Sequence, residues 1–357
     1  MGTCETTQKN LPKSSQNELS SSSNKNNSQN NNKGSSINSK NGKEIYFLSN
    51  EIAKREDITK NYKLIEKKLG FGATSIVCEG ENLEKKKFAV KRISKDNIAP
   101  WHKKNVKKEA EICQKFNHEN IMKYYEIYED LHYISIVMEL GDTDLLELIL
   151  HSPSNIMPED IAIDFMIQIF ESIIYLHSLN IIHCDIKPDN YIVIFNKSED
   201  AIPLLKLSDF GNHIKITLKG ENHFNFCGTK EYMAPEAVEN TGFDEKVDEW
   251  AAGVVMYCML TGQDPFSGDD YSDHKESIRF KKVNFDVIKN EKLRELNKKL
   301  LNRTVKKRIT AKDALDEIKN IKEEKNKENN NINTDVITQQ IKSWKNIKFN
   351  SDSNEKK

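Results

Sequence analysis

The spacing of apolar residues changes near Leu145, and this change limits the folds that the chain can adopt. Before Leu145, short apolar runs bounded by polar residues predict strands. The expected strands cover residues 62–69, 75–80, 87–93 and 134–138, with one charged helical stretch over 105–116. After Leu145 the apolar residues recur at helical spacing, most clearly over 159–179 and 248–260.

This order of elements predicts an α+β fold with two lobes. A small β-rich lobe comes first and a larger α-helical lobe follows, with the link near Glu139, Leu140 and Gly141. We expect residues 61–318 to form this body as one continuous domain.

Both ends of the chain differ from the body in composition. Residues 1–57 are rich in Ser and Asn and hold too few apolar residues to offset the entropy of ordering, which predicts a disordered tether. Residues 319–357 form a polar tail. Some of its apolar residues recur at roughly helical spacing, so a docked helix and a frayed end both fit: Val336, Ile337, Ile341, Trp344 and Ile347.

Charge and cysteine content narrow the class of protein. The net charge of the 357 residues is -1, which gives no general attraction to nucleic acid. The six cysteines lack the paired spacing of a zinc site or a disulfide framework, so we expect most of them to be buried thiols. No apolar run approaches the roughly 20 residues that span a bilayer and no secretory signal is visible, which predicts a cytoplasmic protein.

The stretch from His183 to Asn190 places three polar groups where phosphoryl transfer needs them. Asp185 can orient a hydroxyl nucleophile and accept its proton, and Lys187 can neutralise the transferring phosphate. Asn190 can bind a metal that carries the nucleotide. These residues predict a phosphotransfer loop.

Other segments supply partners for that loop. Gly70 and Gly72 lie at a strand–turn–strand junction, where backbone N–H groups can approach phosphate oxygens. Lys91 is a single lysine on an apolar strand and needs a partner. We expect that partner to be Glu109, with Glu111 and Glu119 as alternatives.

A further carboxylate follows the apolar stretch 204–207. Asp209 begins the sequence Asp209-Phe210-Gly211, nineteen residues after Asn190. A carboxylate that leaves a strand there can coordinate magnesium on nucleotide phosphates.

With these motifs in order, the chain resembles the eukaryotic protein kinase superfamily over roughly 62–315. The motifs are LGFGATSIV, AVK, Glu109, HCDIKPDN, DFG, CGTKEYMAPE, DEWAAGV and Arg308. The resemblance implies ATP and Mg²⁺ as cofactors, with Mn²⁺ as an alternative metal, and protein substrates. It assigns Asp185 as catalytic base, with Lys187, Lys91 and Glu109 as catalytic partners, and Asn190 and Asp209 as metal ligands. It also implies that the following residues bind ATP: Leu69, Gly70, Phe71, Gly72, Ala73, Thr74, Ser75, Ile76, Val77, Ala89, Lys91, Met138, Glu139, Gly141 and Ile192.

Smaller details narrow the resemblance within the superfamily. Lys187 together with Gly228 and Thr229 is typical of the serine/threonine class. The amino-acid sequence of residues 175–183 resembles that of the calcium/calmodulin-dependent kinase group, although the chain carries no EF-hand loop. Cys258 stands where a large basic-directed group carries glutamate, which argues against a preference for a basic residue two positions before the phosphoacceptor. Asp248 resembles the residue that fixes the backbone of the catalytic loop in this family. Glu236 and Arg308 resemble two residues that form a buried ion pair there.

Two positions depart from the pattern of most regulated kinases. Cys184 replaces the arginine that clamps a phosphate on the activation segment, and Asn225 stands where the phosphoacceptor is expected. They predict that the activation segment, 209–236, works without phosphorylation, while neutral drift at Cys184 is the alternative. A membrane-tethered nucleotide-binding pseudokinase scaffold and a small-molecule kinase are the other functions that we weigh.

The amino terminus carries a possible address. Gly2 would be exposed once Met1 is removed, and Thr6 supplies the hydroxyl residue of the N-myristoylation pattern. Cys4 could take a palmitoyl group as the second anchor. Gly2 and Cys4 therefore predict a lipoprotein that is peripheral on a membrane, with an unmodified disordered start as the alternative.

Overall fold

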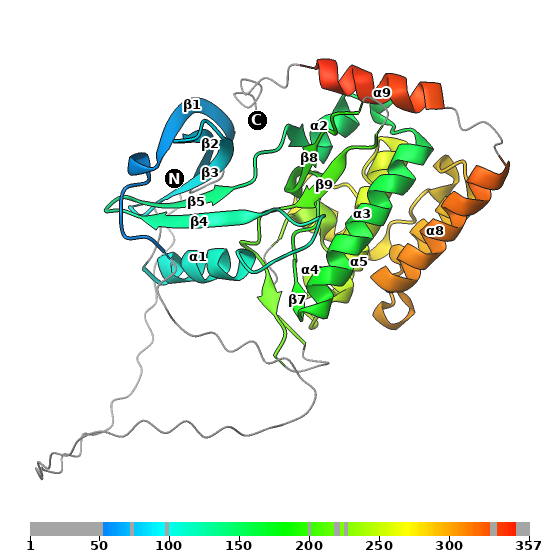
Figure 1. Cartoon of the computed structure of the whole chain (residues 1–357). Coiled ribbons are helices and arrows are strands. Elements are labelled where there is room, and N and C mark those ends of the chain that lie inside the picture. The colour runs from blue at the N-terminus through cyan, green and yellow to red at the C-terminus, as the bar shows by residue number, and fades with distance from the viewer. Residues whose placement is uncertain are drawn as a thin grey trace, which may run out of the picture. The chain divides into compact units, whose positions relative to one another are not determined.

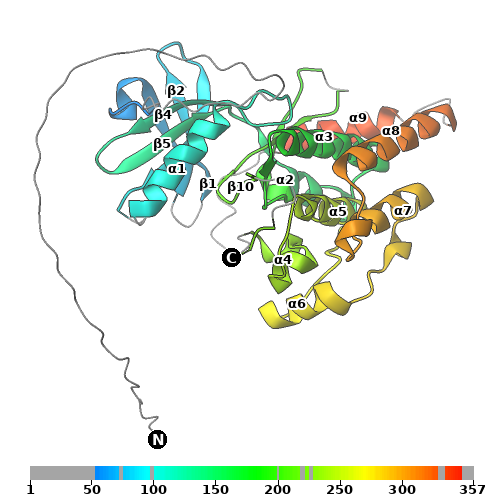
Figure 2. The ribbon, with the colours of Figure 1, turned by 90° about the horizontal axis from the view of Figure 1, so that it is seen from below.

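The computed structural model describes residues 53–71, 75–96, 100–198, 201–217, 222–224, 228–328 and 334–347. All of them lie in one unit, Glu51–Lys357. Its N-terminal part holds an antiparallel five-stranded sheet in the order β1-β2-β3-β5-β4 (Figure 1). The strands are β1 (Tyr62–Phe71), β2 (Ser75–Asn82), β3 (Lys87–Ser94), β4 (Tyr124–Glu129) and β5 (Tyr133–Met138). Helix α1 (Pro100–Cys113) packs beside β4 (Figure 2).

Side chains alternate along a strand, so the two faces of this sheet carry different sets of residues. Val77 on β2, Lys91 on β3 and Ile136 on β5 are neighbours in register, so they share one face. The opposite face carries Val90 and Val137, which are fully buried in a separate small core. The first face is therefore the one that carries the lysine.

The C-terminal part is mainly helical. Its helices are α2 (Leu145–Leu150), α3 (Glu159–Ser178), α4 (Pro235–Glu239), α5 (Lys246–Thr261), α6 (Tyr271–Phe280), α7 (Glu291–Leu300), α8 (Ala311–Glu328) and α9 (Thr334–Asn346). Short strands join β6 (Thr143–Asp144), β8 (Tyr191–Ile194) and β9 (Leu204–Leu207) in one sheet, and β7 (Ile181–Ile182) with β10 (Ile214–Lys215) in another. A 3₁₀ turn, η1 (Ile58–Lys60), precedes β1 in the N-terminal part. The C-terminal part has η2 (Pro153–Asn155), η3 (Pro188–Asn190), η4 (Lys230–Tyr232), η5 (Phe285–Val287) and η6 (Val305–Lys307).

The predicted α+β fold of two lobes is confirmed, and the differences are local. The sequence reading gave no strand at 124–129, because Glu126 and Glu129 obscure the alternation of that strand. Helix α1 begins and ends a few residues earlier than 105–116. Helix α3 is apolar enough to suit a membrane by composition, but its apolar side chains pack in the core between α5 and α8.

The C-terminal tail is more structured than a polar end. Helix α8 continues to Glu328, beyond the expected domain boundary at 318. Helix α9 then buries Ile341 and Trp344 completely, and the Trp344 ring stacks on Phe165 of α3 at 6.5 Å between centroids. Lys345 Nζ donates to two backbone carbonyls between β8 and β9, at 2.9 and 2.8 Å. Of the two alternatives, the structure shows the docked helix.

The segment before β1 also departs from expectation. The backbone N–H of Lys54 donates to the Ile127 carbonyl, and the N–H of Glu129 donates to the Lys54 carbonyl, each at 2.9 Å. Ile58 follows and is fully buried. The prediction of a disordered tether is therefore wrong for 53–57, where Lys54 pairs with β4; residues 1–52, with Gly2 and Cys4, lie outside the described residues.

Candidate active site

The catalytic loop is fixed from below by one carboxylate. Asp248 on α5 is 1% exposed and accepts hydrogen bonds from the backbone N–H groups of His183 and Cys184, at 2.9 and 3.0 Å. Both bonds are needed because Cys184 has a φ of 66°, a left-handed conformation that is costly for a residue with a side chain. Asp248 therefore stabilises the strained turn that presents Asp185.

The Asp185 carboxylate is held at both oxygens. Its Oδ1 accepts from the N–H and the hydroxyl of Thr229, at 3.0 and 2.7 Å. Its Oδ2 lies 3.3 Å from Lys187 Nζ and 3.2 Å from Asn190 Nδ2. Lys187 Nζ also donates to the Thr229 hydroxyl at 2.7 Å. The base, the cation and the amide predicted from one loop are thus brought into a single network.

Asn190 lies directly before β8 and Asp209 lies just after β9, and these two strands are antiparallel neighbours in one sheet. The amide nitrogen of Asn190 donates to the Asp185 carbonyl at 2.7 Å, which leaves its oxygen as an acceptor. Ser208, just before Asp209, donates its N–H to the Asn190 carbonyl at 2.8 Å. A carboxylate and an amide oxygen are ligands that suit Mg²⁺ when phosphates complete its shell. The donor set fits the implied metal.

Lys91 pairs with Asp209 rather than with Glu109. Its Nζ lies 2.7 Å from Asp209 Oδ1, whereas no ion pair to Glu109 forms among the described side chains. Burial favours the neutral amine of Lys91, but the charges of Asp209 and Glu109 outweigh burial and raise its pKa. Burial also opposes ionisation of Asp209, yet Lys91 holds the pKa of that carboxyl below its ordinary value.

Glu109 is left as a buried carboxyl beside this pair. Burial raises its pKa to about 7, the Lys91 ammonium opposes that change, and the Asp209 carboxylate adds to it. The expected direct contact with Lys91 is therefore corrected to a longer-range interaction. Lys91 Nζ is taken up by the Asp209 carboxylate at 2.7 Å, so it acts on Glu109 through charge alone and not through a hydrogen bond.

The predicted walls of the nucleotide site come from five strands (β1, β2, β3, β5 and β8) and the linker. Ala89 on β3 is the register partner of Met138, and both side chains are nearly buried. A Cβ on Gly141 would lie 2.1 Å from the Ile192 side chain, so only glycine lets the linker approach β8 so closely.

Leu69 and Ile76 are exposed on β1 and β2. The chain at Gly72, Ala73 and Thr74 lies outside the described residues. The backbone of Gly70, Phe71, Ser75 and Val77 forms paired strands, and Glu139 donates its N–H to the Lys123 carbonyl.

Two residues that were noted in the sequence, Thr229 and His183, make contacts in the site that the sequence did not predict. Thr229 contacts both Asp185 and Lys187, but spacing along the chain gives no sign of a contact across 44 residues. His183 is fully buried, and burial lowers its pKa, so it is neutral. Its Nδ1 accepts from the Asp185 N–H and its Nε2 donates to the Ser208 carbonyl, at 3.3 and 3.1 Å.

An ion pair stands beneath the activation segment. Arg308 donates to both oxygens of Glu236, at 2.6 and 3.0 Å, and also to the carbonyls of Lys246 and Asn302. The Arg308 side chain is 0% exposed and that of Glu236 is 7% exposed. The pair ties the end of the activation segment to the chain before α8.

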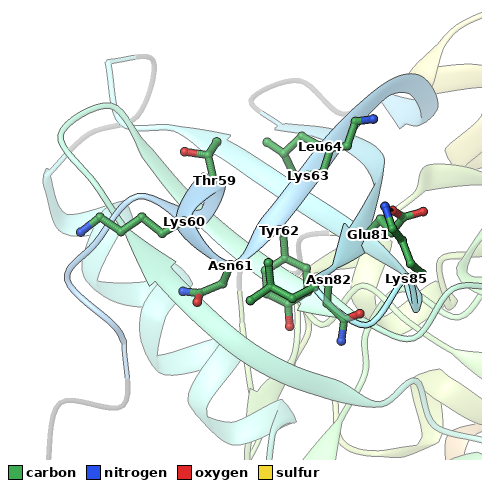
Figure 3. A pocket seen from close by; sticks show the side chains of 10 residues that line it. Thr59, Lys60, Asn61, Tyr62, Lys63, Leu64, Glu81, Asn82 and Lys85 are labelled. Atoms are coloured by element: carbon green, nitrogen blue, oxygen red, sulfur yellow. Dashed lines mark hydrogen bonds and ion pairs between the residues drawn. The ribbon is translucent and has the colours of Figure 1, made fainter.

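A hollow of about 490 Å³ lies elsewhere, on the N-terminal sheet (Figure 3). Its lining includes Asn61, Tyr62, Glu81 and Lys85. None of the predicted catalytic or nucleotide-binding residues lines this hollow, so it is separate from the candidate active site.

Comparisons with known proteins agree with this geometry. Residues 63–319 match the protein kinase domain family. The chain is 34% identical to myosin light chain kinase A of Dictyostelium discoideum over 267 residues, which cover 72% of this chain and 88% of that relative. It is 33% identical to calcium-dependent protein kinase 4 of Plasmodium berghei, over 64% of this chain and 43% of the relative. It is 32% identical to human serine/threonine-protein kinase D2, over 65% of this chain and 26% of the relative.

Proposed function

Because the chain belongs to the protein kinase family and is an ATP-dependent serine/threonine protein kinase, we propose that its activation segment works without phosphorylation. The observation that carries the phosphotransfer itself is the shared network of Asp185, Lys187 and Asn190. That network is complete without any added phosphate.

The chemistry follows from this arrangement. The hydroxyl of a substrate serine or threonine hydrogen-bonds to Asp185 and attacks the γ-phosphorus of ATP, while the bond from that phosphorus to the ADP oxygen breaks. The hydroxyl proton passes to Asp185, and Lys187 neutralises the transferring group. Asn190 and Asp209 would hold the divalent cation, which neutralises charge on the phosphates.

Two features support independence from phosphorylation. Cys184 is 4% exposed and carries no positive charge, so it offers no clamp for a phosphate. Asp185 is held instead by Thr229 at the far end of the activation segment. Asn225, the residue at the expected acceptor position, lies outside the described residues and cannot be phosphorylated.

Phosphatase-treated protein and the Thr217→Ala variant are both expected to retain most of their activity. Thr217 is the hydroxyl residue between Asp209 and Cys227, so removing it leaves that stretch without a phosphoacceptor. The measurement is initial-rate peptide phosphorylation, with mass spectrometry to verify that the segment is unphosphorylated. Loss of most activity in both samples would show that a phosphate is needed.

We also propose that Gly2 is myristoylated and Cys4 palmitoylated, which would place the kinase on a membrane. One acyl chain gives marginal binding and a second makes it stable. Gly2→Ala protein expressed in eukaryotic cells is expected to move to the soluble fraction, with Thr3→Ala as the matched control that stays bound. Membrane binding of Gly2→Ala equal to that of the unchanged protein would contradict acylation.

A further inference from the structure

Glu249 is a buried carboxylate that the reaction described above does not use. It lies on α5 directly after Asp248 and is 2% exposed. Its Oε1 accepts a hydrogen bond from the Ala311 N–H at the start of α8, at 3.1 Å. Its Oε2 is buried and has no hydrogen-bond partner among the described residues. Burial of a carboxylate is costly, and a single hydrogen bond to the start of α8 does not offset that cost.

His177 on α3 is the ionisable group that forms an ion pair with Glu249. His177 Nδ1 lies 3.9 Å from Glu249 Oε1, and His177 Nε2 lies 2.9 Å from Asp248 Oδ2. The imidazole thus faces one carboxylate with each nitrogen. A neutral imidazole carries one N–H and can donate to one of them, whereas the imidazolium can donate to one and attract the other.

Asp248 connects this imidazole to the catalytic loop. Its Oδ2, which meets His177 Nε2, also accepts the N–H of His183, and its Oδ1 accepts that of Cys184. Asp185 is the next residue along the chain. A proton on His177 Nε2 therefore holds the Asp248 carboxylate oriented toward the two amides that set the position of the base.

We propose that Glu249 is a positioning residue for phosphotransfer, which holds a proton on His177 and thereby fixes Asp248 against the catalytic loop. The proposal rests on phosphotransfer at Asp185 as described above. In this proposal, Glu249 acts on the catalytic loop indirectly, through its ion pair with His177 and the contact of His177 with Asp248.

The charges around the pair support this assignment. Burial favours loss of the proton from His177, but Asp248, Glu249 and Glu245 outweigh burial and raise the pKa of the imidazole. Burial raises the pKa of Glu249, while His177 and Lys246 oppose that change.

The remaining charged neighbours are occupied elsewhere. Lys246 Nζ donates to the Arg308 carbonyl at 2.8 Å, and the Arg308 guanidinium is bound to Glu236. On the catalytic-loop side, His183 is neutral because burial lowers its pKa. Helix α8 contributes the uncharged Ala311 amide. Glu249 is therefore the acidic group whose removal leaves the Asp248 contact in place while weakening the hold on the proton.

The test is Glu249→Gln in the full chain. The Gln side chain can keep the Ala311 bond but lacks the charge, so the pKa of His177 should fall by about 1, as expected for loss of a nearby opposite charge. His177 is protonated below its pKa and loses the proton as pH rises through it. In the pH profile of kcat, the decrease at high pH should therefore begin at a lower pH, whereas KM for ATP should not change.

Two measurements make the outcome decisive. Histidine ring ¹⁵N shifts give the pKa of His177 directly, assigned by the signal that is lost in His177→Gln, and they need no activity. Glu245→Gln is the matched control and should shift His177 less. A His177 pKa and an alkaline limb unchanged in Glu249→Gln would reduce Glu249 to a cap of α8. If the variant fails to fold, a His177 pKa below 6.5 in the unchanged protein would overturn the proposal equally. If His177 titrates as proposed but the protein shows no kinase activity, the result contradicts phosphotransfer at Asp185 and not the role of Glu249.

Discussion

Replacing Asp185 by Asn is expected to lower kcat by about 10²- to 10⁴-fold, the range for loss of a general base. The amide can still accept the Thr229 hydrogen bonds but cannot accept the hydroxyl proton, and Lys187 loses its charged partner at 3.3 Å. Nucleotide binding should persist, because Lys91 and Asp209 are untouched. Steady-state peptide phosphorylation and calorimetric titration with ATP analogues separate the two effects.

The control for this variant is Asp269→Asn, which removes an exposed carboxylate outside the site and should leave kcat unchanged. Retention of most of the turnover in Asp185→Asn would mean that another group accepts the proton. The same variant in cells separates catalysis from the pseudokinase scaffold. Cellular function that survives loss of phosphotransfer would favour the scaffold.

Replacing Glu236 by Gln should lower the free energy of unfolding by about 3–5 kcal/mol, the range for breaking a buried ion pair. Arg308 would keep its charge in a site where its side chain is 0% exposed and its bidentate partner is gone. Denaturant unfolding followed by circular dichroism measures the change.

Two further variants test the cause of this loss. In Glu236→Leu/Arg308→Met both charges are removed, so the double variant should be more stable than Glu236→Gln. Glu171→Gln breaks the exposed pair with Lys319 and should cost less than about 1 kcal/mol. A double variant that is less stable than the single one would mean that the contacts of Arg308 with backbone carbonyls matter more than its charge.

The sequence predicted the parts of this fold that depend on local pattern. The inward lysine of β3 and the loop from Asp185 to Asn190 follow from strand alternation and from short fixed spacing. Helix α3 likewise follows from a long 3.6-residue repeat. These features lie within one element or one turn, so neighbouring residues alone specify them.

Contacts between distant segments could not be predicted in the same way. Lys91 binds Asp209 rather than Glu109, a contact between residues 118 positions apart in the sequence. Thr229 meets Asp185 because the activation segment folds back. Glu249 reads from sequence as an ordinary helix residue, and its role emerges when α3, α5 and α8 meet.

The backbone pairing of Lys54 with β4 has a consequence for solubility. Strand β4 ends the five-stranded sheet, and an uncovered edge strand is a template for pairing with another molecule. Lys54 covers one position of that edge with two main-chain hydrogen bonds and places its charged side chain there. The residue that leads into the kinase domain therefore blocks part of the sheet edge, and a charged side chain at this place disfavours pairing of the edge with another molecule.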